Sequence, residues 1–184
     1  RAVKRYDQFQ GDKPLFLALD HRGSLDFLSL KEIADKEEIG VDEVEVEILA
    51  SSLNFRDVLN VLGMYPGDPG APGCEYAGIV SQVGSAVTDL DVGDEVFGIG
   101  QGTLRQRIRT HRVCVVRKPN LISIAESATL PIVYGTVDIG LGTLAKLGPD
   151  DTILIHAAAG GVGLCAIQYA QRVGARIIAS ASAG

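Results

Sequence analysis

The sequence is poor in cysteine and has no excess of basic residues. Among 184 residues there are three cysteines, Cys74, Cys114 and Cys165, which are widely spaced and form no C-x-x-C pair. This pattern predicts free thiols in a reducing compartment, and hence a cytoplasmic protein. Lysine and arginine number 17 against 23 aspartates and glutamates, for a formal net charge of -6, and the basic residues form no run. We therefore expect no nucleic acid partner.

The chain also lacks a segment suited to a membrane. It begins with Arg1 rather than methionine, which indicates a piece of a longer polypeptide, and residues 1–13 are mixed polar without the apolar run of a signal sequence. The stretch 152–171 has no charged residue and is long enough to span a bilayer. However, His156, two adjacent glycines and two glutamines within it favour a buried strand, a tight turn and a helix. We expect no membrane segment.

The first two-thirds of the chain predict short strands. Three apolar residues alternate with three acids, a period of two that turns the apolar side chains inward and the acids to water. The six residues are Glu43, Val44, Glu45, Val46, Glu47 and Ile48. Shorter stretches rich in β-branched residues follow, separated by glycines, at 77–83, 95–99, 103–110 and 113–116. They predict a small barrel or sandwich.

Two helices are expected between and after these strands. Residues 54–63 have apolar residues at helical spacing and a closing glycine, and the proline- and glycine-rich residues that follow predict a rigid loop. A longer helix is expected from about 125 toward 146, with Ser123 or Ser127 as its cap and Pro131 disturbing its first half.

The final third predicts one β-α-β unit. Strands are expected at 152–157 and 176–181, with a helix at 162–173 between them. The first strand is apolar throughout, which is typical of a strand buried on both faces, and the crossover has the length that a parallel pair needs. We interpret His156, at the end of that strand, as a buried structural histidine. The chain is therefore α/β with a β-rich part.

A glycine-rich turn joins the first strand of this unit to its helix. Glycines let the backbone turn sharply, let a diphosphate approach without meeting a Cβ atom, and let the helix pack against the strand. The free N–H groups and the positive end of the helix then face the phosphates. We predict a dinucleotide site at Ala159, Gly160, Gly161, Val162 and Gly163. The alternative is a tight connection that binds nothing.

The choice between the two nicotinamide cofactors depends on the end of the second strand of the unit. Residues 180–184 contain no acid that would bind a free ribose hydroxyl, so nothing there repels a 2'-phosphate. Ser180 and Ser182 can donate hydrogen bonds to that phosphate, or can simply end the strand. We favour NADPH as the cofactor.

Several motifs agree in order and spacing with one superfamily. They are N-F-R-D-V-L at 54–59, G-M-Y-P-G at 63–67, G-C-E-Y-A-G at 73–78, V-G-D-E-V at 92–96 and the glycine turn. From about residue 44 onward the chain resembles the medium-chain dehydrogenase/reductase superfamily. Through the first two motifs it resembles, more narrowly, the enoyl reductase domains of polyketide synthases and the related fatty acid synthases.

The resemblance implies two domains with the active site in the cleft between them. A GroES-like substrate domain would occupy residues 1–124, and a Rossmann cofactor domain would begin at 125–184. A Rossmann domain normally has about six strands, so this one would be incomplete. The family's further proton donors, a lysine and an aspartate, would then lie beyond these residues.

The resemblance also implies an activity and partners. The expected reaction is NADPH-dependent reduction of a trans-2-enoyl thioester carried on an acyl carrier protein, with hydride transfer to the β-carbon and a proton delivered to the α-carbon. Expected partners are the acyl carrier protein, the neighbouring synthase domains and a second copy, as a homodimer formed through the parent synthase.

Three side chains are candidates for the substrate cleft. Tyr65 corresponds to a tyrosine that delivers the α-proton in related reductases, and a phenol is a suitable acid. Asn54 is expected to line the cleft and orient substrate or nicotinamide, or to cap a helix, and one role does not exclude the other. Thr136 matches a family threonine near the nicotinamide, or bonds its own helix backbone.

Other polar residues have simpler interpretations. Arg56 and Asp57 are expected to bridge to neighbouring loops, and Cys74 and Cys165 to pack. We predict no metal, because Asn54 stands where the zinc-dependent alcohol dehydrogenases of the superfamily have a cysteine ligand and the four-cysteine structural lobe is absent.

Two other functions remain open at this stage. One is a stand-alone quinone or enone reductase of the same superfamily, which would act on small enones but not on thioesters. The other is a non-catalytic or repurposed reductase fold within a synthase, which would keep the fold without hydride transfer.

Overall fold

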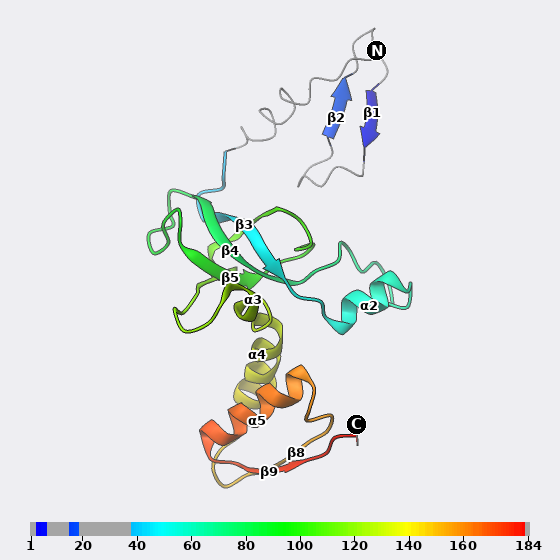
Figure 1. Ribbon diagram of the computed structural model, residues 1–184, viewed down its shortest axis with the longest axis vertical. Coiled ribbons are helices and arrows are strands. Elements are labelled where there is room, and N and C mark those ends of the chain that lie inside the picture. The colour runs from blue at the N-terminus through cyan, green and yellow to red at the C-terminus, as the bar shows by residue number, and fades with distance from the viewer. Residues whose placement is uncertain (1–2, 7–14, 19–37, 183–184) are drawn as a thin grey trace.

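The computed structural model describes residues 3–6, 15–18 and 38–182 (Figure 1). Its strands are β1 (Val3–Tyr6), β2 (Leu15–Ala18), β3 (Glu43–Ser51), β4 (Glu75–Val83), β5 (Glu95–Ile99), β6 (Arg107–His111), β7 (Val115–Arg117), β8 (Thr152–Ile155) and β9 (Arg176–Ala179). Its helical segments are α2 (Phe55–Val61), a 3-10 turn η1 (Arg112–Cys114), α3 (Ile124–Ser127), α4 (Pro131–Val137), a π-helical segment η2 (Asp138–Leu144) and α5 (Gly161–Val173).

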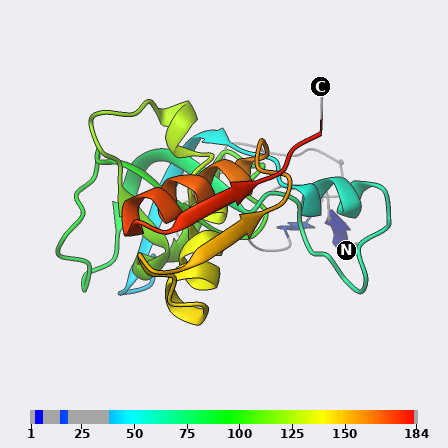
Figure 2. The same ribbon diagram turned by 90° about the horizontal axis from the view of Figure 1, so that it is seen from below.

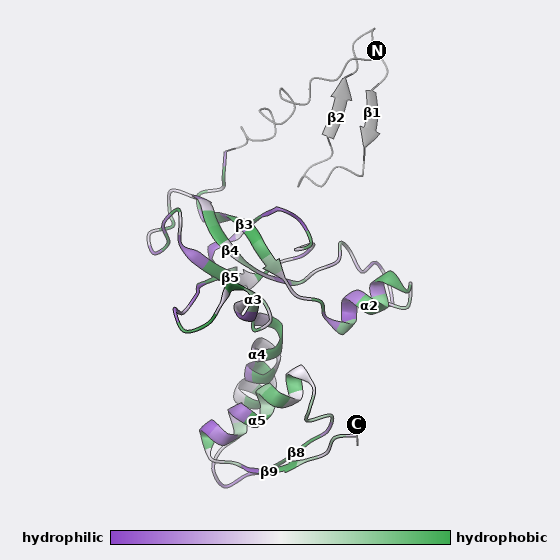
Figure 3. Cartoon of the chain, in the orientation of Figure 1, coloured by the Kyte–Doolittle hydropathy of each residue, from purple (hydrophilic) through white to green (hydrophobic). Residues whose placement is uncertain are grey.

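A five-stranded antiparallel sheet contains the first core. Its strand order is β6-β3-β4-β5-β7, and register shifts between β3 and β4 bend its centre. The strands expected at 77–83 and 95–99 are confirmed. Of the stretches expected at 103–110 and 113–116, only the later part of each is strand, in β6 and β7. The buried core residues are Val44, Val46, Tyr76, Val80, Leu90, Val96, Ile108 and Val115. Figure 3 shows this apolar character along β3 and β4.

The alternation along β3 is confirmed for its apolar residues and wrong for one of its acids. Val44 and Val46 are fully buried, as expected. Glu45, expected in water, is only 5% exposed. It lies directly opposite Arg109 on β6, whose Nε donates to Glu45 Oε2 at 2.7 Å, and Ser81 Oγ donates to Oε1 at 2.8 Å. The cross-strand guanidinium covers the carboxylate and replaces its water.

The single helix expected from about 125 toward 146 is wrong, because three shorter segments replace it. Ser123 caps α3, with its Oγ accepting from the Glu126 N–H at 3.2 Å and Glu126 Oε2 accepting from the Ser123 N–H at 2.8 Å. Pro131 has no N–H for the preceding turn, so α4 starts anew at that residue. Gly142 in η2 allows close packing, since a Cβ there would lie 2.6 Å from the Tyr169 hydroxyl on α5.

The β-α-β unit forms as expected. β8 and β9 pair in parallel, and α5 crosses between them. Figures 1 and 2 show α4 and α5 on one side of this pair. A second core joins α4, β8 and α5 on that side; its buried residues are Val137, Ile155, Ala158, Cys165 and Ala166.

The prediction that the first strand of the unit is buried on both faces is wrong. Ile155 is buried beneath the helices, but its neighbour Leu154 is 54% exposed, and Ile178 on β9 is 50% exposed. Alternate residues of a strand point to opposite faces. In the described part of the chain, helices cover only one of those faces (Figure 2).

The helices α3 and α4 lie between the sheet and the β8-α5-β9 unit (Figure 1). The expected domain division after residue 124 falls at the start of α3. Over the residues described, no helix has both the length and the apolar character needed to cross a membrane.

Candidate functional site

A pocket of about 350 Å³ lies where the sheet meets the helices. The connection from β3 to α2 and the start of β4 form one wall, and α4 with the start of α5 forms the other. Asn54 and Gly161, predicted separately as substrate and cofactor residues, both line it. Its full lining is Ser52, Leu53, Asn54, Glu75, Thr129, Leu130, Val133, Tyr134, Gly161, Leu164, Cys165 and Gln168.

A buried carboxylate, Glu75, joins the two walls of this pocket. Glu75 begins β4 and is 2% exposed. Its Oε1 accepts from Asn54 Nδ2 at 3.0 Å and from the Ser52 hydroxyl, and its Oε2 accepts from the Ile132 N–H in the first turn of α4 at 2.8 Å. Sequence reasoning included this residue in a motif but missed it as a site residue. The available signal was an acid directly before the largely apolar residues 76–80.

Asn54 lies where both of its expected roles would place it, at the start of a helix and in the wall of the pocket. It is the N-cap residue of α2, with an extended backbone, and it also lines the pocket. Its main-chain N–H donates to Asp57 Oδ2 at 2.9 Å. The buried Asp57 in turn accepts from the Gly73 N–H at 2.7 Å, which confirms the prediction that Asp57 bridges to a neighbouring loop.

Tyr65 is half-buried on the loop after α2, and it does not line this pocket. The Arg56 guanidinium lies 5.1 Å from the centre of its ring. Arg56 also donates to the Pro69 carbonyl at 2.9 Å and contacts Cys74 Sγ at 3.6 Å. The prediction that Arg56 bridges to a loop is confirmed, and Tyr65 is held to α2 by this arginine.

Thr136 lies apart from Asn54. Its hydroxyl donates to the Ile132 carbonyl one turn back in α4, at 2.7 Å, as one of its two interpretations expected. It borders a second pocket of about 230 Å³, whose walls come from α4, η2, β8 and α5 and are almost entirely apolar. The structure therefore does not bring Thr136 to the pocket that contains Asn54.

The glycine turn leaves the start of α5 open. Gly160 is the N-cap residue and offers no side-chain cap. Within the described residues, the main-chain N–H groups of Gly161, Val162 and Gly163 have no hydrogen-bond acceptor. A Cβ at Gly161 would meet only Val133, at 3.5 Å. The N–H groups in the first turn of a helix have no acceptor within the helix and normally bind a partner outside it. An anion such as a phosphate is a suitable partner.

Gly163 has a different task from Gly161. A Cβ at Gly163 would lie 2.5 Å from the Ala157 carbonyl oxygen and 2.6 Å from Ala158 Cα. Only glycine allows α5 to approach the end of β8 so closely. Ala159, next to the turn, is exposed.

The end of β9 brings a serine and a histidine together. Ser180 Oγ lies 2.8 Å from His156 Nδ1, and the expectation that His156 is buried is wrong, since it is exposed. It follows the last residue of β8, where the cover given by the helices ends. Ser182 is also exposed.

Two cysteines, Cys165 and Cys74, were expected to pack against other side chains, and no metal site was expected. Cys165 packs in the second core, as expected, and burial raises the pKa of its thiol. Cys74 is half-buried against Arg56. The residues that the structure describes contain no group of three or more histidine, cysteine or acidic side chains arranged to hold a metal ion.

Residues 40–146 match the family model of the alcohol dehydrogenase GroES-like domain. The chain belongs to this family. Among curated proteins, a highly reducing polyketide synthase of Didymella fabae is 44% identical over 169 residues, which are 90% of this chain and 9% of that protein. This family membership confirms the GroES-like fold class, and the polyketide synthase match supports the narrower resemblance.

Solved structures agree with this assignment. The CurK enoyl reductase is 43% identical with a TM-score of 0.75, and the match covers 80% of this chain and 48% of that one. A quinone oxidoreductase of Escherichia coli complexed with NADPH is 33% identical with a TM-score of 0.69, covering 80% and 47%. The resemblance to polyketide synthase enoyl reductase domains of the medium-chain superfamily is thus confirmed, and the chain spans about half the length of these structures.

Proposed function

We propose that this chain is the substrate-domain side of an NADPH-dependent enoyl reductase domain in a polyketide synthase. The observation that carries the proposal is the pocket that Asn54 and Gly161 share. A reductase needs a substrate and a dinucleotide side by side, and this pocket joins a wall of the GroES-like sheet to the uncapped start of a β-α-β helix.

The residues at the start of α5 fit a dinucleotide diphosphate. The N–H groups of residues 161–163 would donate to its oxygens, with Ala159 and Gly160 shaping the turn before them. Ser180 and Ser182, with His156 beside Ser180, would supply donors to a ribose 2'-phosphate. No acid lies at this strand end that would bind a free ribose 2'-hydroxyl and repel a 2'-phosphate, which supports NADPH over NADH.

The chemistry requires a hydride and a proton. NADPH, when bound, supplies the hydride to the β-carbon of the enoyl thioester and is oxidised. Asn54 would orient a group in the cleft, and Tyr65 would deliver its phenolic proton to the α-carbon, so that the carbon–carbon double bond becomes a single bond. Asn54 and Tyr65 lie at opposite ends of α2, and Arg56 fixes the Tyr65 ring to that helix. Thr136 would contribute from the α4 side only if the nicotinamide reaches the second pocket.

The proposed partners follow from the polyketide synthase relative. They are an acyl carrier protein that carries the enoyl thioester, the neighbouring synthase domains and a second copy of the parent synthase as a homodimer. The proposed domains are a GroES-like substrate domain at 1–124 and the first part of a Rossmann domain at 125–184.

The test is oxidation of NADPH with a crotonyl thioester, measured by loss of absorbance in the protein at its natural length and in the 184-residue chain. Turnover of the thioester in the natural-length protein, lost by at least about tenfold in Tyr65→Phe, supports the proposal. Absence of NADPH binding and oxidation in both would overturn it and favour a repurposed, non-catalytic fold.

A second candidate is a quinone or enone reductase, favoured by the similarity to the Escherichia coli quinone oxidoreductase. The same assay separates the two. Turnover of small quinones or enones without turnover of the thioester would support this candidate.

A further inference from the structure

Glu75 has an environment that is unusual for a buried acid. It lies at the junction of the β3–α2 connection, β4 and α4, and each of its oxygens accepts from an amide N–H. The Asn54 side-chain N–H and the Ile132 main-chain N–H can only donate, so both Glu75 oxygens act as hydrogen-bond acceptors. Ser52 adds a hydroxyl donor to the same oxygen that Asn54 reaches.

This carboxylate determines which way the Asn54 amide is turned. A side-chain amide has one end that donates and one end that only accepts. The accepting end cannot face a carboxylate oxygen, so Nδ2 faces Glu75, at 3.0 Å. Oδ1 is left on the other end of the amide, where the capping box of α2 pairs it with the Asp57 main-chain N–H. A carbonyl oxygen has two lone pairs, so Oδ1 keeps a second one for a ligand in the pocket that Asn54 lines.

We propose that Glu75 is a positioning residue that fixes the Asn54 amide, so that Asn54 presents a hydrogen-bond acceptor to the ligand in the pocket. Its ligand is then a donor, such as the carboxamide NH2 or a ribose hydroxyl of a nicotinamide nucleotide. The carbonyl of a thioester only accepts and does not suit Oδ1. This inference rests on the proposed function, since it assumes that a nicotinamide nucleotide enters this pocket.

The first test is a double-mutant cycle read by NADPH fluorescence titration of the natural-length protein, without substrate. We expect Glu75→Gln and Asn54→Ala each to weaken NADPH binding by about tenfold, the effect of one hydrogen bond with a charged partner. If Glu75 acts through Asn54, the double variant binds no more weakly than the weaker single variant. Losses that multiply would overturn the proposal.

A matched control is available within the same sheet. Glu45 is also a buried glutamate, but its partners are Arg109 and Ser81, and it does not line the pocket. Glu45→Gln is expected to lower thermal stability while leaving NADPH affinity within about twofold of wild type. An equal loss of affinity in Glu45→Gln would show that the Glu75 effect is general destabilisation and would overturn the inference.

A second test leaves Glu75 intact. Asn54→Asp keeps an acceptor for the ligand but sets a carboxylate against the Glu75 carboxylate, whereas Asn54→Ala removes the group altogether. With Glu75 as the anchor, Asn54→Asp binds NADPH about threefold or more weakly than Asn54→Ala, because like charges repel. Tighter binding by Asn54→Asp than by Asn54→Ala would overturn the proposal, even if Glu75→Gln does not fold.

These results separate the inference from the proposed function. If wild type does not bind NADPH, the proposed function fails and the inference fails with it. If wild type binds NADPH and the losses in the cycle multiply, only the role of Glu75 fails.

Discussion

The antiparallel sheet and the β8-α5-β9 unit bury their apolar residues in different ways. The sheet encloses its core, and even the buried Glu45 is paired across strands with Arg109. The unit covers one face of its two four-residue strands and leaves Leu154 and Ile178 half-exposed on the other. Figure 3 shows that β8 and β9 are nevertheless mostly apolar, apart from the polar residue that begins each of them. The unit therefore depends on a single contact layer, which makes it the more sensitive of the two regions to changes beneath its helices.

The largest effect is expected where α5 meets β8. Gly163→Ala sets a Cβ against main-chain atoms that cannot move aside, and we expect about 3 kcal/mol of lost stability together with loss of NADPH binding. Urea denaturation followed by circular dichroism measures the first, and fluorescence titration the second.

Gly161→Ala is the control for this change. Its Cβ would only touch Val133, so the fold is expected to stay within about 1 kcal/mol of wild type while a diphosphate loses its close approach. Equal destabilisation by the two substitutions would contradict the division of tasks between these glycines.

A pair of neighbouring residues tests the one-sided burial directly. Ile155→Ala empties space under the helices and should cost about 3 kcal/mol, whereas Leu154→Ala, on the open face, should cost less than about 1 kcal/mol in the 184-residue chain. Urea midpoints of the two variants, measured side by side, decide the point. Similar losses would mean that the open face is covered in solution.

The smallest effect is expected inside the sheet, at Tyr76. Among the described residues its hydroxyl is the buried side-chain atom without a hydrogen-bond partner. Tyr76→Phe removes that polar atom and is expected to stabilise the chain by about 1 kcal/mol. A loss of stability at neutral pH would instead reveal a partner for the hydroxyl.

The same substitution has a pH signature. Burial raises the pKa of the Tyr76 phenol above its ordinary value of 10.0. Above that pH the unfolded chain loses this proton while the folded chain keeps it, so wild-type stability falls as the pH rises. The advantage of Tyr76→Phe over wild type should therefore widen between pH 9 and about pH 11, as followed by thermal unfolding.

Sequence reasoning succeeded where the decisive contacts are local. The helix after Asn54, the cap at Ser123 and the bond from Thr136 to its own helix involve residues at most four apart. The glycine turn also belongs here, because the close approach at Gly163 is made to residues of the same turn. Local propensity and spacing are enough to predict such features.

Sequence reasoning failed where a partner is distant along the chain. Glu45 was expected in water because its cation, Arg109, lies 64 residues away. Glu75 was missed because its role depends on Ile132, 57 residues further on. Periodicity assigns a residue to a face, but it does not reveal which side chain from another strand or helix will cover it.

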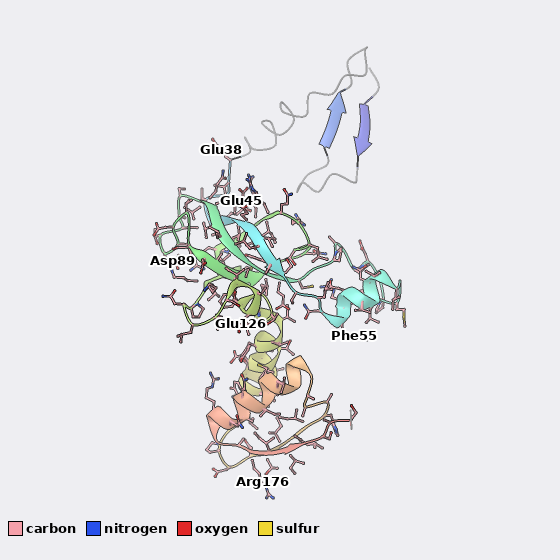
Figure 4. All side chains as sticks on the ribbon, viewed as in Figure 1. Glu38, Glu45, Phe55, Asp89, Glu126 and Arg176 are labelled. Atoms are coloured by element: carbon pink, nitrogen blue, oxygen red, sulfur yellow. The ribbon has the colours of Figure 1, made fainter. Side chains whose placement is uncertain are left out.

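The buried Asp57 has a consequence for how this fold can vary. One of its oxygens accepts from Asn54, where the chain leaves the sheet, and the other from Gly73, where the chain returns. The excursion between them, with α2 and the exposed Phe55 at its start (Figure 4), is closed at its base by this one carboxylate. Since the entropy of closing a loop grows only slowly with its length, residues 58–72 can be lengthened, shortened or exchanged at little cost to the strands. The excursion can therefore differ in length and sequence between related chains while the sheet below it keeps its structure.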